Sequence, residues 1–183
     1  MDAYRYSARE ILRDGRTILI RAQRPNDREA ILAAYARASP TSMYHRFFAS
    51  KRGLSEREAD YFLNIDFVNH VVLLALAEED GRPTIIGGAR YIVVKPSMAE
   101  ISFSILDEYQ GKGIGGALLR HLVKVGREAG LMVFLAEVLA DNEPMLKVFV
   151  GSGLPMTAES EGTVVHVTLR LVEGDDSSVI RGI

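Results

Sequence analysis

YQGKGIGGALL, residues 109–119, is the most informative stretch of this chain. Four glycines fall within residues 111–116, and they let backbone N–H groups approach a ligand that side chains would keep away. An amphipathic helical pattern follows directly, so the unpaired donors and partial positive charge of a helix N-terminus lie beside the glycines. Together these features predict a binding site for phosphate groups.

The segments before this stretch predict three strands of an antiparallel meander. Each segment is largely apolar, and turn signals containing glycine or proline separate them. A bulge is expected at Gly87-Gly88, because glycines inside a strand pattern commonly mark one. The three expected strands are residues 71–77, 84–94 and 99–106.

The segments after the stretch alternate between helix and strand. Apolar residues spaced by three or four predict a helix that begins at Ile114 and ends at Gly130. Asp141 or Asn142 is expected to cap a second helix, with Pro144 tolerated in its first turn. The strands expected in this part of the chain are residues 131–138 and 164–172.

The first third of the chain predicts one strand and two helices. Residues 17–22 alternate as a strand does, and Ser55 with Glu58 forms a capping box at the start of a helix. We expect an N-terminal arm or short edge hairpin over 1–16, one domain over 17–172 and a flexible acidic tail over 173–183. The fold class is α/β, with a mixed, mostly antiparallel central sheet flanked by helices.

Length and composition favour a single globular domain. The chain has 183 residues, of which 48% are hydrophobic and 25% charged, and these values are ordinary for a soluble domain. A formal net charge of −2 gives no global attraction to nucleic acid. The absence of cysteine excludes disulfides, thiolate metal sites and a cysteine nucleophile. No signal peptide or membrane span is evident, so we expect a cytoplasmic protein with no metal, membrane or nucleic-acid partner.

Two kinds of nucleotide-binding site contain glycine-rich loops of this type, the P-loop and the dinucleotide-binding loop. A P-loop requires a lysine followed by serine or threonine, and no lysine in the stretch meets that condition. Gly111, Gly113 and Gly116 do match the dinucleotide pattern G-x-G-x-x-G, and Glu137 lies where a ribose-binding acid is expected. Residues 107–110 separate these glycines from the preceding strand, however, and too little chain follows for further βαβ units. Protection against unfolding by NAD but not by coenzyme A would favour this alternative.

Coenzyme A is the third candidate for the phosphate-bearing ligand, and the residues that favour it resemble those of a known family. The run QGKGIG at 110–115, after a strand and a short acidic-aromatic turn, resembles motif A of the GNAT superfamily of N-acetyltransferases, [R/Q]-x-x-G-x-[G/A]. The resemblance covers residues 17–172 and includes the helix that ends at Gly153-Leu154. LRDGRTILIRAQRPND, SPTSMYHRFF and AEISFSIL are most similar to the protein-lysine acetyltransferase (Pat-like) domains of that superfamily.

The resemblance implies a binding mode for acetyl-CoA. Backbone amides of residues 111–116 would hold the pyrophosphate, and Lys112 would add charge. The pantetheine arm would fill a gap where the strand before the glycines splays from the next one, with Asn142 reaching the pantetheine amide. The implied cofactor-binding residues are Phe103, Ser104 and Ile105 on the strand, then Gln110, Gly111, Lys112, Gly113, Ile114, Gly115, Gly116 and Asn142.

The resemblance also implies the catalytic chemistry. Acetyl transfer needs a neutral amine, and we expect Glu100 to be the general base, because the lysine acetyltransferases have a glutamate at this strand start. Glu100 shares one face of the strand with Ser102 and Ser104 by period two. Glu137 is the reserve base. The general acid is commonly a tyrosine seven residues after the asparagine, and this chain has Phe149 there.

The sequence leaves the acceptor and the assembly open. Tyr44, His45 and Arg46 fall where acceptor-binding residues lie in this superfamily, and the acceptor is a small amine or a protein lysine. The closing strand could pair across a homodimer. Because Phe149 cannot donate a proton, a non-catalytic module that senses acyl-CoA or binds a partner is the alternative function.

Overall fold

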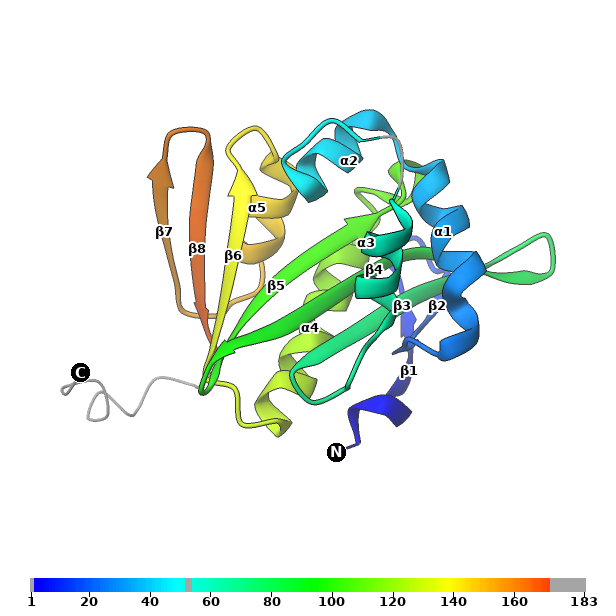
Figure 1. Cartoon of the computed structure of the whole chain (residues 1–183), viewed down its shortest axis with the longest axis horizontal. Coiled ribbons are helices and arrows are strands. Elements are labelled where there is room, and N and C mark those ends of the chain that lie inside the picture. The colour runs from blue at the N-terminus through cyan, green and yellow to red at the C-terminus, as the bar shows by residue number, and fades with distance from the viewer. Residues whose placement is uncertain (1, 52–53, 172–183) are drawn as a thin grey trace.

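The computed structural model describes residues 2–51 and 54–171, and a single sheet runs through this part of the chain (Figure 1). The strands are β1 (Ser7–Ile11), β2 (Thr17–Ala22), β3 (His70–Glu79), β4 (Arg82–Lys95), β5 (Met98–Ile105), β6 (Val133–Leu139), β7 (Met156–Glu161) and β8 (Val164–Arg170). Their order across the sheet is β1-β2-β3-β4-β5-β6-β8-β7. Only β5 and β6 pair in parallel, which confirms the mixed, mostly antiparallel sheet.

Helices lie on both faces of this sheet (Figure 1). The α-helices are α1 (Arg28–Arg37), α2 (Pro40–Phe47), α3 (Glu56–Leu63), α4 (Ile114–Glu128) and α5 (Glu143–Val150). Short 3-10 turns are η1 (Ala3–Arg5), η2 (Pro25–Asp27) and η3 (Asp107–Tyr109). Of the described helices, none is long and apolar enough to cross a membrane.

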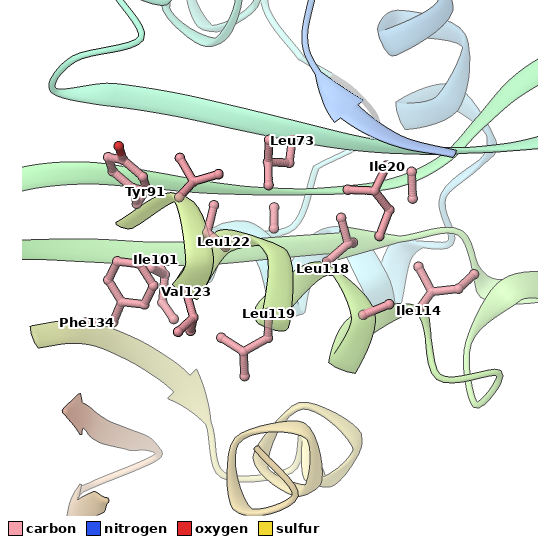
Figure 2. Packing of buried hydrophobic residues seen from close by; sticks show 14 of the residues in the cluster. Ile20, Leu73, Tyr91, Ile101, Ile114, Leu118, Leu119, Leu122, Val123 and Phe134 are labelled. Atoms are coloured by element: carbon pink, nitrogen blue, oxygen red, sulfur yellow. The ribbon is translucent and has the colours of Figure 1, made fainter. Parts of the chain in front are cut away.

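α4 is the helix that fixes the glycine stretch to the sheet. Its apolar side packs on β3, β4 and β5, and Leu118 and Leu122 have no exposed surface (Figure 2). Each fully buried leucine contributes about 1.5–3 kcal/mol. Ile114, the first residue of the helix, is buried in the same cluster. The N-terminus of α4 is therefore held rigidly beside the end of β5.

α1 and α3 cover only part of the opposite face. A smaller apolar cluster joins them to β3 and β4, and its buried members are Ile31, Val72, Leu74, Leu76 and Ile85. Ser55 and Glu58 form the expected capping box at the start of α3. Because this cluster stops at β4, the face of β5 and β6 is left for the cleft described below.

One end of the sheet takes one of the two forms expected for residues 1–16, and the other end contains a strand that was not expected. The first residues form the edge hairpin: β1 pairs with β2, and the side chains of Tyr6 and Leu12 are buried in the main core. At the other edge, β7 is a strand that the sequence pattern did not predict, because five of its six residues are exposed. The predicted tail, 173–183, lies outside the described residues.

The bulge in β4 lies one residue earlier than predicted. Pairing with β3 shifts between Ile85 and Gly87, so Ile86 is the extra residue. Gly87 itself is required by a close approach, because a Cβ atom there would lie 2.9 Å from the backbone oxygen of Ser104. This glycine lets β5 pair tightly with β4 beside the predicted site.

Candidate active site

A cleft opens where β5 and β6 stop pairing. The two strands pair at Met98↔Val133, Ala99↔Phe134 and Glu100↔Leu135, and then diverge while each continues for several residues. A cleft of about 730 Å³ occupies this region and is lined by both diverging strands and by α1, α2, α4 and α5. The splay expected between these strands is therefore present.

The main chain of β5 presents polar groups to the splayed gap. The N–H of Leu106 donates to the carbonyl oxygen of Ile86 on β4. N–H and C=O groups of successive residues point to opposite edges of a strand, so those of Phe103 and Ile105 face the gap. The main chain of Ser104 instead faces β4, and this residue offers only its side chain to the cleft.

The hydroxyl of Ser104 has no partner within the described residues. Its Oγ is buried and forms no hydrogen bond there, although the side chain lines the cleft. A buried hydroxyl without a partner is costly, typically about 1–3 kcal/mol. The hydroxyl of Ser104 is thus a polar group at the cleft that a ligand could satisfy.

The glycine stretch has the geometry of an anion site. Gly111 and Gly113 have φ values of 72° and 89°, which other residues rarely adopt. Gly113 is the N-cap of α4 and provides no side chain to the first turn. Among the described residues, no acceptor is bonded to the N–H groups of residues 111–116. These donors line one end of the cleft at the positive end of the helix.

Two side chains of the stretch brace the loop. The Nε2 atom of Gln110 donates to the carbonyl oxygen of Ile105 at 3.1 Å and to Oγ of Ser42 at 3.0 Å. The Nζ atom of Lys112 donates to the carbonyl of Glu108, and Lys112 is the one predicted cofactor residue outside the cleft lining. In this conformation the side chain of Gln110 ties the loop to β5 and α2, and that of Lys112 ties it to the preceding 3-10 turn.

Asp107 is a positioning residue that sequence reasoning missed. Its carboxylate accepts from the N–H and Oγ of Ser39 and from Oγ of Ser42, at 2.6–2.9 Å. Burial acts to raise the pKa of Asp107, but these hydrogen bonds outweigh burial and lower it. The bonds connect the turn before the glycines to α2. The signal available was an acidic residue at the end of a strand, which alone does not name its partners.

The two candidate bases lie on the same face of the sheet, on either side of the splay. Glu100 is exposed and belongs to the last paired position of β5 and β6, just outside the residues that line the cleft. Glu137 lines the cleft, and its Oε1 lies 3.5 Å from Nδ1 of His166. No ion pair of Glu100 occurs among the described residues, whereas the carboxylate of Glu137 has the imidazole of His166 beside it.

Asn142 and Phe149 come from α5 and its cap. Oδ1 of Asn142 accepts from the N–H of Met145 at 3.3 Å, as an N-cap does, and the residue also lines the cleft. Phe149 is 1% exposed and packs edge-on against Phe103, with ring centroids 6.0 Å apart. The ring of Phe149 packs against β5 through Phe103, and it has no proton to donate.

The end of the cleft under α2 and α3 is cationic and aromatic. His45 and Arg46 line it, whereas Tyr44 does not, and Nε2 of His45 lies 3.2 Å from Oδ1 of Asp141. Arg90 on β4 also lines this end, although no sequence pattern indicated a role for this residue. Of the three predicted acceptor-side residues, two therefore reach the cleft.

Known proteins with similar sequences are named acetyltransferases. Residues 31–153 match the acetyltransferase (GNAT) family. The chain is 34% identical to acetyltransferase PA5475 of Pseudomonas aeruginosa over 137 residues, which is 74% of each chain. It is 30% identical to acetyltransferase Pat of Mycolicibacterium smegmatis over 156 residues, 84% of this chain but only 46% of Pat.

Solved structures agree with these matches. The GNAT domain of S. lividans PAT superposes with a TM-score of 0.81 at 34% identity, covering 90% of this chain and 96% of that domain. The protein yncA from Salmonella typhimurium, solved with acetyl-CoA, shares the fold at 20% identity, with a TM-score of 0.67 over 85% of this chain and 95% of its own. This chain is a member of the acetyltransferase (GNAT) family, which uses acetyl-CoA.

Proposed function

We propose that the protein transfers the acetyl group of acetyl-CoA to a primary amine, a lysine side chain of a protein among the candidates, with Glu100 as the general base. The observation that carries this proposal is the cleft itself, which joins the N–H donors of residues 111–116 to the splayed edge of β5. The resemblance of the sequence to the Pat-like protein-lysine acetyltransferase domains supports the lysine acceptor, and the matches to proteins named Pat and PAT agree with that resemblance.

The residues present fit coenzyme A. Residues 111–116 would hold its diphosphate, and the gap-facing main chain of Phe103 would pair with a pantetheine amide, because the carbonyl of Ile105 already accepts from Gln110. The unpartnered hydroxyl of Ser104 offers one further polar contact on the same path. When bound, acetyl-CoA supplies a thioester whose acyl carbon accepts the amine.

Glu100 has a clear task in this reaction. A lysine with a pKa of ~10.4 is neutral in about one molecule of 2,500 at pH 7, so most acceptor molecules arrive protonated. Glu100 would take that proton, and the amine nitrogen would then bond to the acyl carbon. The carbon–sulfur bond would break, and the departing thiolate would take the second proton that the nitrogen loses as it becomes an amide. The N–H of Ile105 faces the gap and is the candidate donor to the developing oxyanion. A thiolate with a pKa of ~8.5 leaves without an acid, which makes Phe149 tolerable.

Paired variants test the base. We expect Glu100→Gln to lower turnover about 10²- to 10⁴-fold at pH 7 while the KM for acetyl-CoA stays unchanged. The remaining rate should rise tenfold per pH unit up to the pKa of the amine, because only neutral amine then reacts. The measurement is thiol release over a panel of amines and lysine peptides between pH 6 and pH 10.

Glu137→Gln is the matched control for this experiment. It removes a carboxylate from the other side of the splay and should change turnover less than tenfold. If Glu137→Gln lost activity and Glu100→Gln retained it, Glu137 would be the base. If acetyl-CoA bound tightly but no amine released thiol, the chain would be an acyl-CoA-sensing module on the same fold, which is the alternative that Phe149 favours.

A further inference from the structure

Arg90 is a buried cation at the acceptor end of the cleft. Its side chain is 7% exposed, yet it lines the cleft. Its Cζ lies 3.9 Å from the ring centroid of Phe62, and its Nη1 lies 3.4 Å from Nε2 of His70. Tyr35 also lies close enough to stabilise the charge, although burial lowers the pKa of Arg90 to about 10. The guanidinium is therefore still charged at neutral pH.

No carboxylate pairs with Arg90 among the described residues. His70 cannot replace one, because burial and then the charge of Arg90 lower the pKa of His70 to about 4 and leave it neutral at pH 7. The acidic residues that line the cleft are both engaged elsewhere. Asp107 accepts hydrogen bonds from Ser39 and Ser42, and Glu137 pairs with His166.

Arg46 adds a second positive charge at this end. Its Cζ lies 4.9 Å from the ring centroid of Phe47 and 5.6 Å from that of Phe62, so Arg46 and Arg90 share the Phe62 ring. The charge of Arg46 disfavours that of Arg90, and no ion pair relieves either one among the described residues. Cation–π contacts offset only part of the desolvation of a buried guanidinium.

We propose that Arg90, with Arg46 beside it, binds a carboxylate carried by the acceptor amine. A guanidinium binds a carboxylate through two parallel hydrogen bonds, and the ligand would then supply the counter-ion that Arg90 lacks within residues 2–51 and 54–171. This inference rests on the proposed function, because it assigns the chemical class of the amine that the cleft acetylates.

The register of the sheet sets the length of such an acceptor. Arg90 lies opposite Ser102, and Ser102 lies two residues beyond Glu100 on the same face of β5. Two residues of a strand span about 7 Å. An amine near Glu100 and a carboxylate at Arg90 can therefore belong to one molecule whose two groups are separated by a few methylenes.

A series of ω-amino acids of one to six methylenes, each compared with its own amide, tests the assignment. The wild type should prefer one or two lengths as acids over amides by about 10- to 150-fold in kcat/KM. Arg90→Gln should abolish that preference by losing activity on the acid, with the amide rate and the KM for acetyl-CoA nearly unchanged. Arg82→Gln, an exposed arginine on the same strand, is the matched control and should keep the preference.

Three further readouts make the result decisive. Thermal unfolding shows whether Arg90→Gln is folded, and Arg90→Lys, which keeps the charge without the bidentate fork, should retain part of the preference. Calorimetry with the acids and the amides separates binding from acetyl transfer. If the wild type binds the acids more tightly than the amides, Arg90→Gln loses this difference and no amine releases thiol, this inference holds although the proposed function fails. Equal rates for acids and amides at every length would overturn it. A preference for succinyl-CoA over acetyl-CoA that disappears in Arg90→Gln would also overturn it, by placing the carboxylate on the acyl group.

Discussion

Arg21 and Arg90 are both buried on the same face of the sheet, but within the described residues only Arg21 has a carboxylate as its counter-ion. Each is 7% exposed. Nη1 and Nη2 of Arg21 donate to the two carboxylate oxygens of Asp27 at 2.7 and 2.8 Å, whereas Arg90 contacts an aromatic ring and a neutral histidine. The buried charge of Arg21 on β2 is thus neutralised by Asp27, whereas the buried charge of Arg90 on β4 is left for a ligand.

The largest effect expected from this comparison is on stability. Asp27→Ala should reduce the free energy of unfolding by about 3–5 kcal/mol, because it leaves Arg21 buried without a partner. Arg90→Met should change it by about 1 kcal/mol or less, or even raise it, since no ion pair within the described residues is broken. Urea unfolding of both variants at pH 7 measures the difference. Equal losses at both positions would show that the protein itself stabilises the charge of Arg90.

Acid unfolding sharpens the same contrast. Burial acts to raise the pKa of Asp27, but hydrogen bonds from Arg21 and Arg24 outweigh it, so the folded pKa is lowered. The stability from this pair is then complete above the unfolded pKa of about 3.9 and is lost as the pH falls through the lower folded value. Asp27→Ala should lack this part of the acid sensitivity, and Arg90→Met should keep it.

Sequence reasoning was strongest where neighbours along the chain determine the structure. The glycine stretch, α4, the cap at Asn142 and the capping box at Ser55 each depend on residues within one or two turns. The splay of β5 from β6 came from the family resemblance, since no local pattern encodes where two strands stop pairing.

Features that depend on distant residues were missed. The interest of Arg90 comes from its contact with Phe62 on α3 and from the lack of a carboxylate partner in the described part of the chain, and the strand pattern around Arg90 indicates neither. β7 was missed because an exposed edge strand needs no apolar alternation and gains its pairing from β8 alone. The acceptor end is assembled from α2, α3 and β4, so its chemistry appears only after folding.

A comparison of the glycines at the two ends of α4 tests which end binds the phosphate groups, and the expected effect is of intermediate size. Gly113 and Gly130 have φ values of 89° and 80°, and a Cβ atom at either would meet nothing within 4 Å. Alanine at either position should therefore cost a similar amount of stability, about 1–2 kcal/mol, from the left-handed backbone. Only Gly113→Ala should also weaken acetyl-CoA, about tenfold or more, because it shifts the N–H donors.

Isothermal titration with acetyl-CoA, together with urea unfolding, measures both quantities for this pair. Loss of affinity in Gly130→Ala as large as in Gly113→Ala would show that binding follows helix stability in general. It would then no longer identify residues 111–116 as the phosphate site.

The smallest effect concerns single hydroxyl groups. Ser39 caps α2 and donates to Asp107, so Ser39→Ala should reduce the unfolding free energy by about 1 kcal/mol. Ser104→Ala removes a buried hydroxyl without a partner in the described residues, and it should leave the free protein as stable or slightly more stable. The cost should appear only on binding, as an affinity for acetyl-CoA lowered about 2- to 10-fold. A stability loss in Ser104→Ala with unchanged affinity would show that this hydroxyl, like the Arg21–Asp27 pair, stabilises the free protein, and the polar lining of β5 would then need another explanation.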